Sequence, residues 1–308
     1  MKIPQGIKRN ISLKNYSTFK IGGKARSFVE VKTLEHLITV LKWAKTNQYP
    51  FFILGNGSNT LFSDKGYEGL IIKINNSERP EIFKKTCLIT AGTLVATFLT
   101  ECVKNQWQGF EWLAGIPGTI GGVIYGNAGA FGCEIKDYVK KVIVLDLKTL
   151  KLKTYSKAQC KFHYRESIFK KLPIIIWQAE LKIKKGKKNI IQQKIHDNWQ
   201  YKIQRHLFEY PSAGSVFKNI IIKDNPIIKK ISKAVPIKGG KVSAGWFIDE
   251  CGLKGHQYGG AQIANFHSNV IINVKNAKAS DILHLIKLMK DKVWKKFKIK
   301  LQEEIIIT

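Results

Sequence analysis

The chain of 308 residues is 44% hydrophobic and 24% charged, which is typical of a globular protein and excludes a disordered tail, a collagen and a small disulfide-bonded scaffold. The 52 Lys and Arg residues against 22 Asp and Glu give a net charge of +30, in the range of nucleic-acid-binding proteins. Only five of the 52 are arginines, the residue best suited to reading bases and phosphates, and the lysines are spread along the chain. We therefore expect a solvated, lysine-rich surface that attracts anionic substrates, with no specific nucleic-acid site.

Hydrophobic periodicity predicts alternating strands and helices. Strands are expected at residues 27–31, 51–54, 70–74, 88–91, 142–147, 152–155, 174–183 and 301–307. Helices are expected at residues 34–44, 95–104, 282–297 and in part of 186–210. Thr33 and Ser280 are the expected N-caps of the first and last helices in chain order. The pattern indicates an α+β protein with mixed sheets, which we divide at residues 1–78, 79–200 and 201–308.

Two segments are candidates for binding phosphate. The strand expected at 51–54 leads into a turn of small residues, Gly55, Asn56, Gly57, Ser58 and Asn59, whose backbone N–H groups can converge on an anion. An ordinary tight turn explains these residues equally well. The second segment, residues 115–132, has seven glycines in 18 residues, against 25 in the whole chain of 308, so its backbone can approach a ligand closely.

Neither segment has the glycine spacing of a Rossmann dinucleotide site or of a P-loop. Two separated glycine-rich loops nevertheless indicate a long ligand with a pyrophosphate in its middle. This combination fits a dinucleotide that is bound outside the Rossmann plan.

Other classes of site have little support in the sequence. The five cysteines include no C-x-x-C pair and the seven histidines have no metal-ligand spacing, so we expect no metal site. No apolar run approaches the ~20 residues that cross a bilayer, and no apolar segment follows the basic start, so we expect a reduced, soluble, intracellular protein without a membrane partner. The segment 212–219 lacks the G-x-S-x-G elbow of a hydrolase.

Six segments, taken together, resemble one family over some 290 residues: the UDP-N-acetylmuramate dehydrogenases, also called UDP-N-acetylenolpyruvoylglucosamine reductases. Residues 15–23 look like the family's opening flavin motif, and 54–59 and 114–132 look like its two FAD pyrophosphate loops. The remaining segments follow in the family's order at residues 164–169, 212–219 and 244–255.

The resemblance implies a fold and a reaction. The fold is a two-subdomain FAD-binding unit of the vanillyl-alcohol-oxidase type, here residues 1–78 and 79–200, plus an α+β substrate domain over 201–308. The length resembles the shorter variant of the family, without the inserted capping loop. The reaction is reduction of UDP-N-acetylglucosamine enolpyruvate to UDP-N-acetylmuramate, a peptidoglycan precursor, with non-covalent FAD as cofactor and NADPH as co-substrate. We expect a cytoplasmic monomer.

The resemblance also implies roles for individual residues. Arg165 and Glu304 are expected to stabilise the charge that develops when a hydride from flavin N5 reaches the vinyl carbon, and Ser215 is expected to donate the proton to the adjacent carbon. Lys218, Asn219 and His267 are expected to bind substrate. The expected FAD-binding residues are Ile21, Gly22, Gly55, Asn56, Gly57, Ser58, Asn59, Leu61, Gly115, Ile116, Pro117, Gly118, Gly121, Gly122, Asn127, Gly129 and Ala130.

Three positions depart from the family pattern. Ile220 stands where proline is usual, Glu303 replaces the proline before the catalytic glutamate, and Ile306 replaces an arginine. None of them is an expected catalytic residue. Two alternative functions remain open: another FAD oxidoreductase of the same fold that acts on a hydroxy acid or sugar, and a basic nucleic-acid-binding protein.

Overall fold

The computed structural model of the chain describes residues 2–223, 227 and 235–308. The chain forms two compact units, and each is assembled from separate parts of the sequence. The first unit comprises residues 1–11, 25–56 and 68–204, and the second comprises 12–24, 57–67 and 205–308. The division into three parts at residues 78 and 200 stays a prediction.

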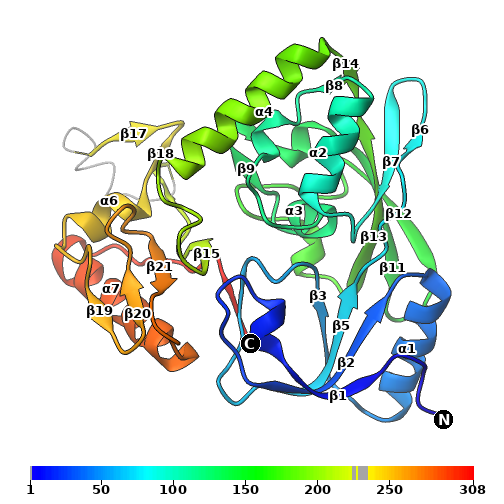
Figure 1. Cartoon of the computed structure of the whole chain (residues 1–308), viewed down its shortest axis with the longest axis horizontal. Coiled ribbons are helices and arrows are strands. Elements are labelled where there is room, and N and C mark those ends of the chain that lie inside the picture. Colours follow the sequence, from blue (N-terminus) through cyan, green and yellow to red (C-terminus); the bar gives the residue numbers. More distant parts are fainter. Residues whose placement is uncertain (1, 224–226, 228–234) are drawn as a thin grey trace. The chain divides into compact units, whose positions relative to one another are not determined.

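The first unit begins with a four-stranded sheet in the order β1-β2-β5-β3 (Figure 1). Its strands are β1 (Lys8–Ser12), β2 (Lys24–Val31), β3 (Phe51–Leu54) and β5 (Tyr67–Ile74). β3 and β5 are parallel. Helix α1 (Leu34–Thr46) lies between β2 and β3 in the chain, and the Thr33 side chain accepts a hydrogen bond from the backbone N–H of His36. This confirms Thr33 as the N-cap.

The same unit contains an antiparallel five-stranded sheet in the order β12-β11-β13-β7-β6. Its strands are β6 (Glu81–Ile82), β7 (Thr86–Thr90), β11 (Val139–Asp146), β12 (Leu152–Ser156) and β13 (Ile174–Lys182). The accompanying helices are α2 (Val95–Lys104), α3 (Ile120–Tyr125) and α4 (Lys188–Ile203). Two short ribbons pair β9 (Gly129–Ala130) with β10 (Cys133–Glu134), and β8 (Trp107–Gln108) with β14 (Lys184–Lys185).

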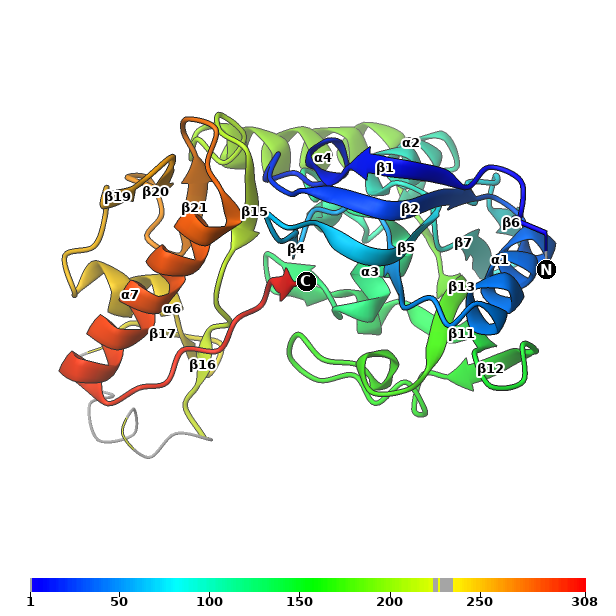
Figure 2. The same cartoon turned by 90° about the horizontal axis from the view of Figure 1, so that it is seen from below.

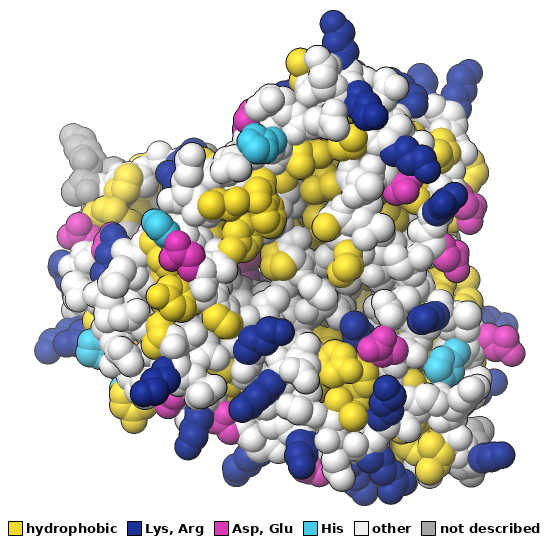
Figure 3. Space-filling view, viewed as in Figure 1, with side chains coloured by type: hydrophobic (Ala, Val, Ile, Leu, Met, Phe, Trp, Pro, Cys, Tyr) yellow, Lys and Arg dark blue, Asp and Glu magenta, His cyan; other side chains and the backbone are white. Residues whose placement is uncertain are grey.

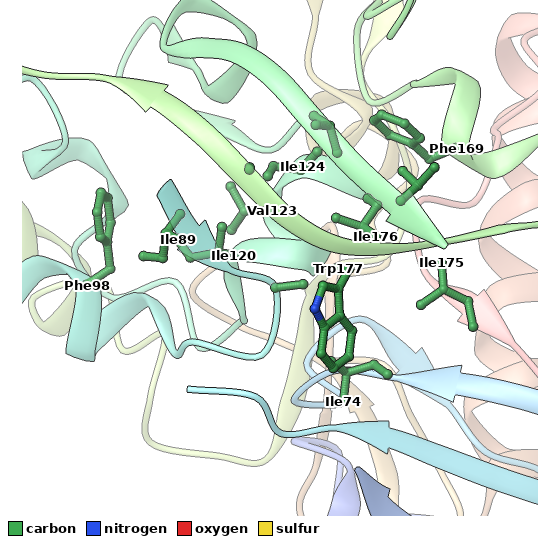
Figure 4. Packing of buried hydrophobic residues seen from close by; sticks show 14 of the residues in the cluster. Ile74, Ile89, Phe98, Ile120, Val123, Ile124, Phe169, Ile175, Ile176 and Trp177 are labelled. Atoms are coloured by element: carbon green, nitrogen blue, oxygen red, sulfur yellow. The ribbon is translucent and has the colours of Figure 1, made fainter. Parts of the chain in front are cut away.

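Packing against the five-stranded sheet holds α3 in place. Figure 4 shows Ile120, Val123 and Ile124 of α3 gathered with Ile89 of β7 and Ile176 of β13, and all five belong to one buried cluster. Because α3 lies within the glycine-rich segment, the hydrophobic core fixes the position of one of the expected phosphate-binding loops.

The second unit is built on an antiparallel sheet in the order β15-β21-β20-β19. Its strands are β15 (Ser212–Ser215), β19 (Gln257–Tyr258), β20 (Ala261–Ile263) and β21 (Val270–Asn273). Helix α7 (Ala279–Phe297) packs against β19 and β20 (Figure 2). Further elements among the described residues of this unit are β4 (Thr60–Leu61), β16 (Ile220–Ile221), β17 (Ile237–Lys238), β18 (Lys241–Val242), α6 (Ala244–Asp249) and β22 (Ile306–Ile307).

Two local predictions at the C-terminal end were wrong. Ser280 is not the N-cap of α7, because the helix already begins at Ala279. The carboxylate of Asp64, distant in sequence, accepts hydrogen bonds from the N–H groups of Ala279 and Ser280. The strand expected at 301–307 is shorter, because only β22 pairs with β4, and Glu303 forms an isolated bridge with Phe217.

One face of the molecule agrees with the expected dispersal of charge. Figure 3 shows Lys and Arg side chains distributed over the face in view, with Asp and Glu among them. Among the described residues, no helix is both long enough and apolar enough to span a bilayer.

Candidate active site

The two glycine-rich loops meet in the first unit. The Asn56 side chain donates a hydrogen bond to the carbonyl of Pro117 over 2.6 Å. A Cβ added to Gly55 would lie 2.7 Å from Thr119 Oγ1, so the loops approach each other through a glycine. Segments 60 residues apart in sequence thus lie side by side, as one ligand bound across both would require.

Adjacent glycines of α3 have different surroundings. The N–H of Gly121 donates to the carbonyl of Ala91, and a Cβ added to Gly121 would lie 2.9 Å from the Ala91 side chain. Gly121 therefore serves close packing within the protein. Within 4 Å, a Cβ added to Gly122 would meet only Thr119 Oγ1 among the described residues, at 3.6 Å, which leaves room there for a ligand. This open backbone fits the expected cofactor.

Asn127 connects the glycine-rich segment to the turn that carries Arg165. Asn127 is completely buried, and its amide nitrogen donates to the carbonyl of His163 over 2.7 Å and to Glu134 over 3.1 Å. Its amide oxygen accepts from the N–H of Lys136. These bonds give Asn127 a structural role beside the expected one toward FAD, which stays a prediction.

Arg165 lies at the tip of a tight turn. His163 and Glu166 exchange backbone hydrogen bonds, so Tyr164 and Arg165 form a two-residue turn, and Arg165 has a φ of 54°. Its guanidinium donates to the carbonyl of Gly129 over 2.9 Å. The turn thus places an arginine directly beside the glycine-rich segment, where its fixed geometry suits an anionic group.

Residues 15–23, the expected flavin motif, pack against the part of the first loop that begins at Gly57. Both segments belong to the second unit. Gly57 has a φ of 65°, and a Cβ there would overlap the carbonyl oxygen of Tyr16. The N–H of Thr18 donates to the carbonyl of Gly57, and the hydroxyl of Ser17 donates to the backbone carbonyl of Thr60. Only glycine therefore fits at position 57.

The surroundings of three residues in this region change what we expect of the cofactor-binding set. The side chains of Ile21 and Leu61 lie in the core cluster of the second unit, so a contact of either with FAD would come from the backbone. Thr18 was not predicted, yet its Oγ1 is buried without a hydrogen-bond partner among the described residues. Because a buried hydroxyl without a partner costs free energy, Thr18 is a further candidate for contact with the cofactor.

The segments that carry Ser215 and Glu304 pair with each other in the second unit. The N–H of Glu304 donates to the carbonyl of Val216 over 2.7 Å, and Phe217 bridges Glu303. Both Ser215 and Glu304 are half-buried. The C-terminal segment therefore runs beside the residues that follow β15, although almost 90 positions separate the two in sequence.

Asn59 holds the same C-terminal segment from its other side. Its amide nitrogen donates to the carbonyl of Glu304 over 3.0 Å, and its carbonyl accepts from the N–H of Ile306. One of the expected cofactor-binding residues thus fixes the backbone of the expected catalytic glutamate. Its role toward FAD stays a prediction.

Two of the expected substrate-binding residues, Asn219 and His267, lie near the start of α6. The Asn219 side chain accepts from the N–H of Ala244, the first residue of α6, and a Cβ added to Gly245 would lie 3.5 Å from the His267 ring. Burial lowers the pKa of His267 below its usual value, against the opposing effect of a backbone hydrogen bond. The third expected residue is Lys218, whose backbone N–H donates a hydrogen bond to the carbonyl of Gln302.

The three departures from the family pattern have local structural roles. Glu303 forms an ion pair with Lys290 of α7 over 2.8 Å. Ile220 begins β16 and pairs with Val242, and Ile306 pairs with Thr60. These interactions anchor the segments on which Ser215 and Glu304 lie.

Lys202 of α4 also contacts the glycine-rich segment, although the sequence did not single it out. Its ammonium group donates to the carbonyl of Ala114 over 2.5 Å, at the start of the glycine-rich segment, and lies 5.8 Å from the centre of the Phe131 ring. Burial lowers the pKa of Lys202 to about 8 from its ordinary value of 10.5. In sequence it is one lysine among many, so only burial distinguishes it.

We expect Lys202 to make stability depend on pH. Between about pH 8 and 10.5 the unfolded chain still holds a proton that the folded chain has released, so the free energy of unfolding rises with pH over this window. In Lys202→Met this contribution should disappear. Urea unfolding of both proteins at several pH values measures it, with Lys194→Met on the exposed side of α4 as the control. A difference between wild type and Lys202→Met that stays constant with pH would contradict the assignment.

Comparison with known proteins identifies the family. Residues 25–149 match the family described as FAD binding domain, and residues 190–308 match UDP-N-acetylenolpyruvoylglucosamine reductase, C-terminal domain. A curated UDP-N-acetylenolpyruvoylglucosamine reductase from Alkaliphilus oremlandii is 36% identical over 96% of this chain and 91% of its own length. One from Prochlorococcus marinus is 33% identical over 97% of both chains. The chain belongs to the UDP-N-acetylenolpyruvoylglucosamine reductase family.

A solved structure agrees with this assignment. The crystal structure of the reductase from Thermus caldophilus superposes with a TM-score of 0.76 at 30% identity and covers 98% of both chains. The expected α+β fold, with an FAD-binding unit and a C-terminal domain of this reductase family, is confirmed. The chain is thus a flavoenzyme of the oxidoreductase class, with FAD as its cofactor.

Proposed function

We propose that this chain uses NADPH to reduce UDP-N-acetylglucosamine enolpyruvate to UDP-N-acetylmuramate for peptidoglycan synthesis, as a monomer in the cytoplasm. The observation that carries the proposal is the backbone hydrogen bond from Glu304 to Val216, the residue after Ser215, in a chain that belongs to this reductase family. Within the first unit, Arg165 lies beside the glycine-rich loop.

The cofactor would be held by backbone and amide groups. Gly55, Asn56 and Gly122 line the region where the two loops meet, and Gly57 and Thr18 lie at the second unit's part of the first loop. Non-covalently bound FAD supplies the transfer of a hydride from NADPH to the substrate. The net charge of +30 favours approach of the anionic substrate and of NADPH.

The chain's own residues would complete the reduction at the double bond. When a hydride reaches the terminal vinyl carbon, negative charge develops beside the substrate carboxylate. The guanidinium of Arg165 stabilises this charge, and in a site with little water such stabilisation is a large effect. Glu304 assists at the same centre, and the Ser215 hydroxyl gives its proton to the adjacent carbon. One hydride and one proton thus saturate the double bond.

Steady-state NADPH oxidation with and without the enolpyruvyl substrate tests the proposal. We expect fast oxidation only with the substrate present, and a product that has gained two hydrogens by mass spectrometry. The flavin should be released on denaturation, since it is not covalently bound. NADPH oxidation with a hydroxy acid or sugar in place of the enolpyruvyl substrate would favour another flavin oxidoreductase. A colourless protein that binds nucleic acid selectively at physiological salt would overturn the proposal.

A further inference from the structure

Asn269 is attached at three points to the backbone that follows Ser215. It is 2% exposed and lies immediately before β21. Its carbonyl accepts from the N–H of Val216 over 2.8 Å. Its amide oxygen accepts from the N–H of Phe217 over 3.0 Å, and its amide nitrogen donates to the carbonyl of Phe217 over 2.8 Å.

These bonds stand where the regular strand ends. β15 pairs with β21 at Ser212 and Ser215 with an irregular register between them, and Gly214 adopts a φ of 71°. Beyond the end of β15, the side-chain amide of Asn269 provides the hydrogen-bond partners for the N–H and the carbonyl of Phe217 that a neighbouring strand would otherwise provide. The carbonyl of Val216 is held from the opposite side by the N–H of Glu304. The peptide groups after Ser215 are therefore held between β21 and the C-terminal segment.

We propose that Asn269 is a positioning residue that aims the Ser215 hydroxyl at the substrate carbon. The inference rests on the proposed role of Ser215 as proton donor. A donor hydroxyl must be placed within a few tenths of an ångström, and a misplacement of about 1 Å can cost roughly 10²-fold in rate. Ser215 lies at the end of its strand, where the pairing with β21 is irregular and Gly214 has a φ of 71°, so we infer that the strand alone does not fix the hydroxyl this accurately.

The first test measures Asn269→Ala in the two half-reactions by stopped flow. We expect flavin reduction by NADPH to stay near the wild-type rate, and reoxidation by the enolpyruvyl substrate to slow by roughly 10²-fold. The matched control is Asn76→Ala. Asn76 is 1% exposed and joins the carbonyl of Trp177 to the N–H of Gly92 with the same pair of amide contacts, in the first unit. The control should lose comparable stability and keep both rates.

A double-mutant cycle separates positioning from a general loss of structure. If Asn269 acts through Ser215, adding Asn269→Ala to Ser215→Ala should slow reoxidation no further. Independent, multiplicative effects of the two substitutions would overturn the proposal. If Ser215→Ala alone leaves reoxidation unchanged, the proton-donor role itself fails. If Ser215→Ala slows reoxidation and Asn269→Ala does not, only the positioning role fails.

Asn269→Asp gives a test in a protein that keeps the shape of the side chain. Burial should raise the pKa of the new carboxyl, whose protonated form can still donate to the carbonyl of Phe217, whereas the carboxylate repels it. Reoxidation should therefore slow as pH rises through that pKa, in a step that Asn269→Ala lacks. The neighbouring titratable groups are His267, Glu303 and Glu304, so the wild-type profile is subtracted. A profile identical to wild type would contradict the proposal.

Amide hydrogen exchange gives a readout that needs no activity. The N–H of Phe217 should exchange faster in Asn269→Ala, because its acceptor is removed, while that of Val216 keeps the backbone carbonyl at position 269. Unchanged protection of Phe217 would show that the amide does not hold this segment, and would overturn the proposal.

Discussion

Ser215→Ala should slow reoxidation of the flavin by the enolpyruvyl substrate by about 10²–10⁴-fold, the usual range for loss of a general acid. Flavin reduction by NADPH needs no proton from a serine and should stay close to the wild-type rate. The loop should remain in place, because Ser215 pairs with Val270 and the next residues are held by Asn269 and Glu304. Stopped-flow measurement of each half-reaction decides the outcome.

Two further variants make the Ser215 test specific. Ser215→Cys should recover part of the lost rate, because a thiol is a stronger acid with similar reach. Ser212→Ala, at the other end of the same strand and equally half-buried, should leave both half-reactions unchanged. If Ser215 only stabilises the loop, alanine would weaken substrate binding or stability and affect the half-reactions equally. Reoxidation of Ser215→Ala at the wild-type rate with saturating substrate would rule out the proton-donor role.

Gly122→Leu should yield a folded protein that purifies with little or no flavin. Among the described residues, a Cβ at Gly122 meets only Thr119 Oγ1 within 4 Å, at 3.6 Å, so the first atom of the new side chain does not clash with the protein. That room is the expected path by which the backbone approaches FAD, so leucine should occupy the cofactor's place. Absorbance of the purified protein gives flavin content, and thermal unfolding in the absence of flavin shows whether the fold is intact.

The neighbouring glycine provides the contrast. Gly121→Ala should destabilise the fold itself, because its Cβ would lie 2.9 Å from Ala91 in close-packed surroundings. Gly122→Ala, with a smaller side chain, should reduce flavin affinity less than leucine does. A Gly122→Leu protein with full flavin content would show that FAD is not bound across this face of α3.

Local patterns in the sequence predicted the longer strands of the first unit and the helices α1, α2, α4 and α7, but not the short strands β15–β21 of the second unit. Thr33 caps α1 as predicted, since a cap depends on residues within one turn of each other. Ser280 does not cap α7, because the helix already begins at Ala279, and Asp64, more than 200 residues away, accepts from the N–H groups of Ala279 and Ser280. The final strand is short because its partners, β4 and Phe217, come from two different parts of the chain.

The sequence by itself was sufficient to predict the family, which the comparisons confirm, and to locate the two glycine-rich segments, because these depend on residue type and order. The catalytic roles of Arg165, Ser215 and Glu304 stay predictions. The tertiary structure decided which of those residues meet. It placed Asn56 against Pro117, Glu304 beside Val216 and the buried Asn269 against Phe217. Such contacts join segments far apart in the chain, and they form only where packing buries polar groups that must then find partners. No local pattern of residues specifies which partner is found.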